Sequence, residues 1–166
     1  PMTAGEPDLV GPEILDGHLY DYPAYYDLIF GSDCAAETAF FEDCFRQLAR
    51  RPVERIFEPA CGTGRLLYRL ARRGYSVSGN DLNPHAVAYC NARFERAGWD
   101  SPAALGDMAD FRLRRKADAA FNTINSFRHL DNEDAARSHL GCVAAALARG
   151  GLYLLGLHLT PTRGPR

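Results

Sequence analysis

Excess charge of one sign, long apolar runs and paired cysteines are all missing from this sequence. The chain has 19 basic and 21 acidic residues, a net charge of −2, so nothing indicates nucleic acid or an anionic membrane as a partner. No apolar stretch reaches the ~20 residues of a membrane span, and no signal-peptide pattern opens the chain. We therefore expect a cytoplasmic protein.

Cysteine usage excludes two further classes. The five cysteines are scattered and never form a C-x-x-C pair, which indicates neither a metal site nor a disulfide framework and fits a reducing cytosol. The sequence does have an ordinary globular composition, 46% hydrophobic and 24% charged residues. Its 166 residues suggest one domain with a single core.

Strands and helices are expected to alternate along most of the chain. The expected strands are 53–58, 75–81, 103–107, 117–125 and 152–159. The expected helices are 33–50, 63–73, 83–98 and 131–151. This order predicts an α/β, Rossmann-like, doubly wound fold with a mostly parallel sheet.

Capping residues give the expected helix ends. Ser32 or Asp33 is predicted to cap the first helix, Asn83 the third and Asp131 the fourth. Gly150–Gly151 is predicted to end the fourth helix.

The stretch IFEPACGTGRLL, residues 56–67, joins the first strand to a helix through two glycines. In such a sheet, ligands bind beyond the carboxyl ends of the strands, where this loop lies. Gly62 and Gly64 let the backbone turn sharply and approach a ligand without a Cβ. The helix that begins near Thr63 directs free N–H groups to the same place, which suits a carboxylate or a phosphate.

Two cofactors compete for this loop. A dinucleotide fingerprint requires a third glycine, and Leu67 stands there instead. Asp81, at the end of the next strand, can accept the ribose hydroxyls of either cofactor, or it could cap the following helix. Glu58 adds negative charge before the loop, which favours a cation over a pyrophosphate.

The stretch GDMADF, residues 106–111, favours an adenine ring. Asp107 can accept the exocyclic amine, while Met108 can lie on the ring face and donate its backbone N–H. The alternative is a polar loop with a buried methionine.

Together, EPACGTGR (58–65), Asp81, GDM (106–108), FNTINSFRHL and GGLYLLGLHL resemble the class I S-adenosylmethionine-dependent methyltransferases. The resemblance covers about residues 20–160 and is to small-molecule methyltransferases with an E-P-A-C-G-T-G-R motif. It implies S-adenosyl-L-methionine as cofactor, with its methionine end at Glu58 and the glycine loop, its ribose at Asp81 and its adenine at Asp107 and Met108. The cofactor-binding positions that it implies are Tyr20, Tyr26, Glu58, Ala60, Cys61, Gly62, Gly64, Arg65, Asp81, Leu82, Asp107, Met108, Asn122 and Asn125.

The stretch FNTINSFRHL, residues 121–130, leaves the fourth strand where the reactive methyl group should lie. His129 is the candidate catalytic base, because histidine exchanges protons near neutral pH, or it is a structural residue before the next helix. Asn122 and Asn125 could orient a substrate or contact the cofactor.

Tyrosines are concentrated in LYDYPAYYDLIF, residues 19–30. In similar methyltransferases a segment with YYD closes over the cofactor, which implies that Tyr20, Tyr25 and Tyr26 cover its methionine end. The alternative is that they are core aromatics of the first helix. His85 and His139, within helices, are expected at the surface.

The predicted organisation is a flexible arm (1–17), a helical lid segment (18–52), an S-adenosylmethionine-binding core (53–160) and a tail (161–166). The sheet lacks the last two strands of the family, so we expect a fragment or association, including a homo-oligomer. The predicted activity is methyl transfer to a small-molecule acceptor by in-line displacement. The alternatives are a non-catalytic or truncated cofactor-binding subunit and, third, an NAD-dependent oxidoreductase.

Overall fold

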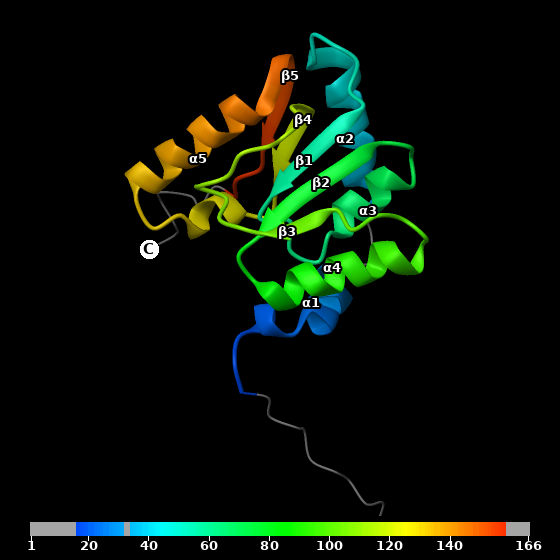
Figure 1. Ribbon diagram of the computed structural model, residues 1–166, viewed down its shortest axis with the longest axis vertical. Coiled ribbons are helices and arrows are strands. Elements are labelled where there is room, and N and C mark those ends of the chain that lie inside the picture. Colours follow the sequence, from blue (N-terminus) through cyan, green and yellow to red (C-terminus); the bar gives the residue numbers. More distant parts are fainter. Residues whose placement is uncertain (1–15, 32–33, 159–166) are drawn as a thin grey trace, which may run out of the picture.

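The computed structural model describes residues 16–31 and 34–158 of the chain (Figure 1). Its centre is a five-stranded sheet in the order β3-β2-β1-β4-β5, in which neighbouring strands run parallel. The strands are β1 (Arg55–Pro59), β2 (Ser76–Asp81), β3 (Ala103–Leu105), β4 (Ala117–Asn122) and β5 (Leu147–Leu155). The helices are η1 (Leu19–Asp21), α1 (Pro23–Phe30), α2 (Ala35–Leu48), α3 (Arg65–Ala71), α4 (Pro84–Arg96), η2 (Ser126–His129) and α5 (Glu133–Ala146). The predicted doubly wound α/β fold is confirmed.

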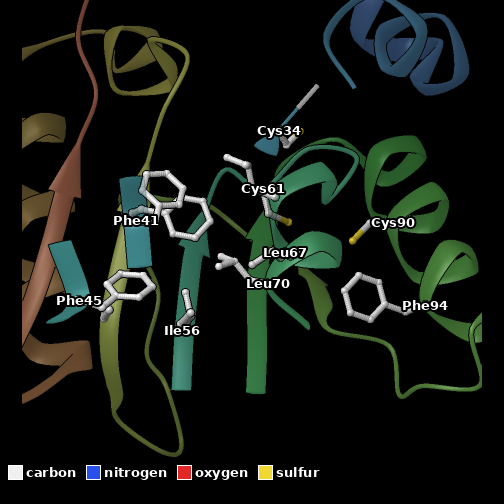
Figure 2. Packing of buried hydrophobic residues seen from close by; sticks show 12 residues of the cluster. Cys34, Phe41, Phe45, Ile56, Cys61, Leu67, Leu70, Cys90 and Phe94 are labelled. Carbon is white, nitrogen blue, oxygen red and sulfur yellow. The ribbon is translucent and has the colours of Figure 1, made fainter. Parts of the chain in front are cut away.

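Helices cover both faces of the sheet. Ile56 and Phe57 are successive residues of β1, so their side chains point to opposite faces. Ile56 packs in a cluster with residues of α2, α3 and α4, and Figure 2 shows Phe41 and Phe45 of α2 beside it. Phe57 packs in a second cluster with Val143 of α5. The helices cover the two faces of the sheet, and the site lies at the carboxyl ends of its strands.

Leu67 occupies the position where a dinucleotide fingerprint has its third glycine. Its side chain is 0% exposed and fills the space between α3 and the sheet, in the same cluster as Ile56 and Leu70. The close helix–strand contact that a third glycine permits is therefore not the packing used here.

The end of α5 differs from the prediction. The helix ends at Ala146, and β5 already begins at Leu147, so Gly150–Gly151 lies within a strand. The pairing of β5 with β4 shifts register near its start, and the Gly150 carbonyl accepts a hydrogen bond from the Arg50 N–H at 2.9 Å. These long-range contacts make an extended, bulged segment more favourable than a last helical turn.

Two of the predicted caps can be compared with the structure. Asn83 caps α4 as predicted. The prediction of Asp131 as the cap of α5 is wrong, because Asn132 holds that position and accepts from the Ala135 N–H at 2.9 Å. The residue that precedes α2 is Cys34, while Ser32 and Asp33 lie outside the described residues.

The placement of His139 also corrects the sequence prediction. His139 is 0% exposed, whereas His85 is exposed as expected. His139, Val143 and Ala146 follow the spacing of one helix face, and that face of α5 is buried.

The expected arm (1–17) and tail (161–166) lie outside the described residues apart from Asp16 and Gly17. Among the residues that are described, no helix combines the length and apolar character needed to cross a membrane.

Candidate cofactor-binding site

A cavity of about 440 Å³ lies beyond the carboxyl ends of the strands. Its walls come from the segments that follow β1, β2, β3 and β4, and η1 with α1 adds a further wall. The lining residues are Leu19, Tyr20, Pro23, Tyr26, Phe30, Ala60, Gly62, Thr63, Asp81, Leu82, Asn83, Ala86, Gly106, Met108, Ile124, Ser126 and His129.

The predicted site residues divide into two sets. Those that line the cavity are Tyr20, Tyr26, Ala60, Gly62, Asp81, Leu82, Met108 and His129. Those that do not line it are Glu58 of β1, Cys61 and Gly64 of the glycine loop, Arg65 of α3, Asp107 after β3, Asn122 of β4 and Asn125 before η2.

The two glycines of the loop after β1 serve different purposes. Both have positive φ angles, 53° at Gly62 and 67° at Gly64. A Cβ added at Gly64 would lie 2.3 Å from Cys90 Sγ of α4, so helix packing requires glycine there. A Cβ at Gly62 would meet no protein atom within 4 Å, and this residue faces the cavity.

Asp81 links β2 to the glycine loop. Its Oδ2 accepts a hydrogen bond from the Gly62 N–H at 2.7 Å, and its Oδ1 accepts from the Asn83 N–H at 2.9 Å. Asn83 Oδ1 accepts from the N–H groups of His85 and Ala86 at 2.9 and 3.3 Å. The cap of α4 is thus Asn83, and the Asp81 carboxylate remains at the cavity wall.

Glu58 is a buried carboxyl group with an unpaired oxygen. The residue is 7% exposed, and its Oε2 has no hydrogen-bond partner among the described residues. Burial raises the pKa of Glu58 well above its usual range, against the opposing effect of the Arg65 charge. The structure therefore keeps an uncompensated acceptor next to the glycine loop.

Arg65 does not neutralise Glu58 directly. Its guanidinium forms two hydrogen bonds to the Glu37 carboxylate, at 2.7 and 2.8 Å, and a third contact to Cys34 Sγ at 3.1 Å. Burial lowers the pKa of Arg65, but the Glu37 carboxylate outweighs this effect and raises it overall. Arg65 thus joins α3 to α2.

The tyrosine-rich residues 19–30 are held at the site by contacts of Asp27 in α1. Asp27 accepts a hydrogen bond from Thr63 Oγ1 of the glycine loop at 3.1 Å and forms an ion pair with Arg93 of α4. Figure 1 shows α1 lying alongside α4. Asn83 Nδ2 donates to the Tyr20 carbonyl at 2.9 Å. These contacts place the Tyr20 and Tyr26 rings at the cavity.

The wall after β3 contains Met108, whose side chain is buried and lines the cavity. Asp107 is exposed and does not line the cavity; its Oδ1 accepts from the Ala109 N–H at 2.7 Å, and its carbonyl accepts from Asn80 Nδ2 at 3.0 Å. The Asn122 amide donates to the Pro59 carbonyl at 3.0 Å, and its Oδ1 is buried without a partner among the described residues.

The wall after β4 contains His129 in η2. Its ring is exposed and lines the cavity, with Nε2 3.4 Å from Tyr20 Oη. Asn125 has a φ of 60°, and its Oδ1 accepts from the His158 N–H at 2.6 Å, so it stabilises the turn before η2. His129 is the ionisable side chain on this wall.

Several lining residues were not predicted from the sequence. Thr63 and Gly106 lie within the stretches 56–67 and 106–111. Their closeness in sequence to predicted site residues could therefore have indicated them. Ile124 lies within the stretch 121–130 that was also singled out, but the sequence does not indicate its φ of 52°, which a β-branched residue rarely adopts. The apolar η1–α1 positions Leu19 and Pro23 depend on where that segment docks.

The methyltransferase domain family matches residues 56–151, more than half of the chain. The chain therefore belongs to this family, which confirms the resemblance found in the sequence. It is 27% identical over 122 residues to a methyltransferase from Geobacillus sp. (strain WCH70), covering 74% of this chain and 49% of that protein.

Two further relatives are more informative about chemistry. The chain is 28% identical over 139 residues to dTDP-3-amino-3,4,6-trideoxy-α-D-glucopyranose N,N-dimethyltransferase from Streptomyces venezuelae, covering 81% of this chain and 56% of that protein. An amino pentose methyltransferase from Micromonospora echinaspora, solved with S-adenosylmethionine bound, has a TM-score of 0.72 and 28% identity over 93% of this chain and 62% of that one. The chain spans about half the length of the curated relatives that it matches.

Proposed function

We propose that this chain is the cofactor-binding part of an S-adenosylmethionine-dependent methyltransferase that acts on a small molecule. The observation that carries the proposal is the unpaired Glu58 carboxyl beside the glycine loop. A buried acceptor of this kind suits a cationic ligand better than a pyrophosphate. The buried Leu67 side chain supports the same choice against a dinucleotide.

The residues present fit the proposed cofactor. Glu58 and the glycine loop would hold its amino-acid end. Asp81 would accept the ribose hydroxyls, and Met108 would lie on the adenine. In this assignment Asp107, Asn122 and Asn125 act mainly by holding those walls in place, as their hydrogen bonds support.

When bound, the cofactor supplies a methyl group that a sulfonium has already activated. The chain's main task is therefore to hold an acceptor in line with this methyl group, at ~3 Å. Proximity of this kind alone lowers the activation free energy by several kcal/mol. Tyr20 and Tyr26 present aromatic rings to the cavity and would exclude water from a cation there. Of the predicted lid segment (18–52), η1 and α1 would thus cover the cavity, whereas α2 packs Phe41 and Phe45 in the core.

An amino group is the acceptor that we propose. Two relatives carry amino-sugar or N-methylating activities in their names, and His129 lines the cavity beside Tyr20. A neutral imidazole at this place would remove the proton of an ammonium acceptor before transfer, because the nitrogen attacks the methyl group with the electron pair that this proton occupies. We also propose a cytoplasmic location. It is supported by the free thiols, which are Cys34, Cys44, Cys61, Cys90 and Cys142.

Methyl transfer from labelled S-adenosylmethionine to a panel of amino sugars, phenols and carboxylic acids tests this proposal. We expect label in the amines and its loss in the His129→Asn variant. Cofactor binding without transfer to any acceptor would instead support the non-catalytic subunit of the same fold. Transfer to phenols or acids alone would contradict the amine assignment.

A further inference from the structure

A buried histidine lies directly behind the cavity wall formed by Met108. His139 of α5 places Nδ1 2.8 Å from the Met108 carbonyl oxygen and Nε2 2.7 Å from the hydroxyl oxygen of Tyr153 in β5. The ring is also 5.4 Å from that of Phe127 in η2, centroid to centroid, at 73°. One side chain therefore contacts β5 and two segments that line the cavity, the loop after β3 and η2.

The hydrogen bonds define the protonation of this ring. A carbonyl oxygen can only accept, so Nδ1 must carry a proton. Nε2 is then free to accept from the Tyr153 hydroxyl. Burial lowers the pKa of His139, against the opposing effects of the Met108 carbonyl and the Asp107 charge, which agrees with this neutral form.

The loop 107–110 depends on α5 for its position. Ser138 Oγ donates to the Ala109 carbonyl at 2.7 Å, next to the His139 bond to Met108. The Met108 sulfur lies 3.9 Å from Asn122 Nδ2, so this residue is held from both ends. Among the residues joined by these contacts, Met108 lines the cavity, and Ala109, Asn122, Ser138 and His139 do not.

We propose that His139 is a positioning residue, whose Nδ1–H holds the Met108 carbonyl and thereby sets how tightly the nucleoside end of the ligand binds. The inference rests on the proposed function. His139 itself does not line the cavity, so it acts through Met108.

Variants of the intact protein can separate this role from simple packing. The amide nitrogen of asparagine can occupy the place of Nδ1, whereas glutamine reaches the place of Nε2. We expect His139→Asn to bind S-adenosylhomocysteine within about threefold of the wild type. We expect His139→Gln and His139→Leu to bind it about tenfold more weakly, because the Met108 carbonyl loses its donor. Tyr153→Phe is the matched control, since it removes only the Nε2 partner.

Hydrogen exchange of the Ala109 amide, without ligand, tests the loop itself. This amide donates to Asp107 Oδ1, so its exchange should be about tenfold faster in His139→Gln and unchanged in His139→Asn. Equal protection and equal affinity in both variants would overturn the inference. A wild-type protein that does not bind S-adenosylhomocysteine contradicts the proposed function instead, and the exchange measurement then decides the role of His139.

Discussion

Replacing Glu58 by glutamine should stabilise the protein while weakening its site. The carboxyl group is buried, its Oε2 has no hydrogen-bond partner among the described residues, and burial raises its pKa. Glutamine keeps the shape and removes the charge. At neutral pH the substitution should raise the free energy of unfolding by about 1–2 kcal/mol, in the range seen when strained functional sites are relieved.

The pH dependence of this gain has a definite sign. Because the folded-state pKa of Glu58 lies above its usual value, the folded protein binds more protons than the unfolded chain between those two pKa values. Across that window the stability of the wild type falls as pH rises, whereas the amide of the variant does not titrate. The advantage of Glu58→Gln should therefore grow from pH 4.5 upward.

Affinity should change in the opposite direction. Glutamine keeps an oxygen that can accept from a ligand ammonium but loses the charge that strengthens this hydrogen bond by about 1–1.5 kcal/mol, so binding should weaken about tenfold. Thermal unfolding between about pH 4.5 and 8, with titration of S-adenosylhomocysteine, measures both effects. Glu54→Gln, at an exposed residue just before β1, is the matched control. A pH-independent loss of stability with unchanged affinity would refute the reasoning.

Gly64→Ala should lower the unfolding free energy by about 2 kcal/mol, since its Cβ would lie 2.3 Å from Cys90 Sγ at a positive φ. Adding Cys90→Ala should recover part of the lost unfolding free energy in denaturant titrations. If the effects of the two substitutions simply add, the contact between residues 64 and 90 is not the cause of the loss. Asp27→Asn removes the ion pair with Arg93 and should speed hydrogen exchange in α1, whereas unchanged exchange would mean that other contacts hold this helix. His129→Asn should lower kcat about 100-fold with unchanged affinity for S-adenosylhomocysteine, and an equal loss of affinity would assign it to binding.

Local patterns were sufficient for most of the fold. The alternation of apolar strands with amphipathic helices predicted five strands in a mostly parallel sheet, and Asn83 was recognisable as a cap. Asp81, at the end of β2, was also singled out as a site residue, and it lines the cavity and accepts from the Gly62 N–H. These features depend on periodicity, turn chemistry and sheet topology, which short stretches of sequence specify.

Features that depend on distant contacts were not predictable in this way. His139 stands in a polar, helical stretch, and its burial depends on a carbonyl 31 residues away in sequence. The start of β5 has helical composition, yet pairing with β4 and the bond from the Arg50 N–H to Gly150 make it extended. Likewise, Arg65 was expected to contact the cofactor, but its guanidinium forms an ion pair with Glu37 of α2.

Calorimetric titration of S-adenosylhomocysteine and of NAD into the intact wild-type protein and its Asp81→Ala variant tests the central claim most directly. We expect saturable binding of S-adenosylhomocysteine to the wild type and no binding of NAD. Binding to Asp81→Ala should be at least about tenfold weaker, because the carboxylate that accepts from the Gly62 and Asn83 N–H groups at the cavity wall is lost. Binding of NAD without binding of S-adenosylhomocysteine, or an affinity that Asp81→Ala leaves unchanged, would contradict the account.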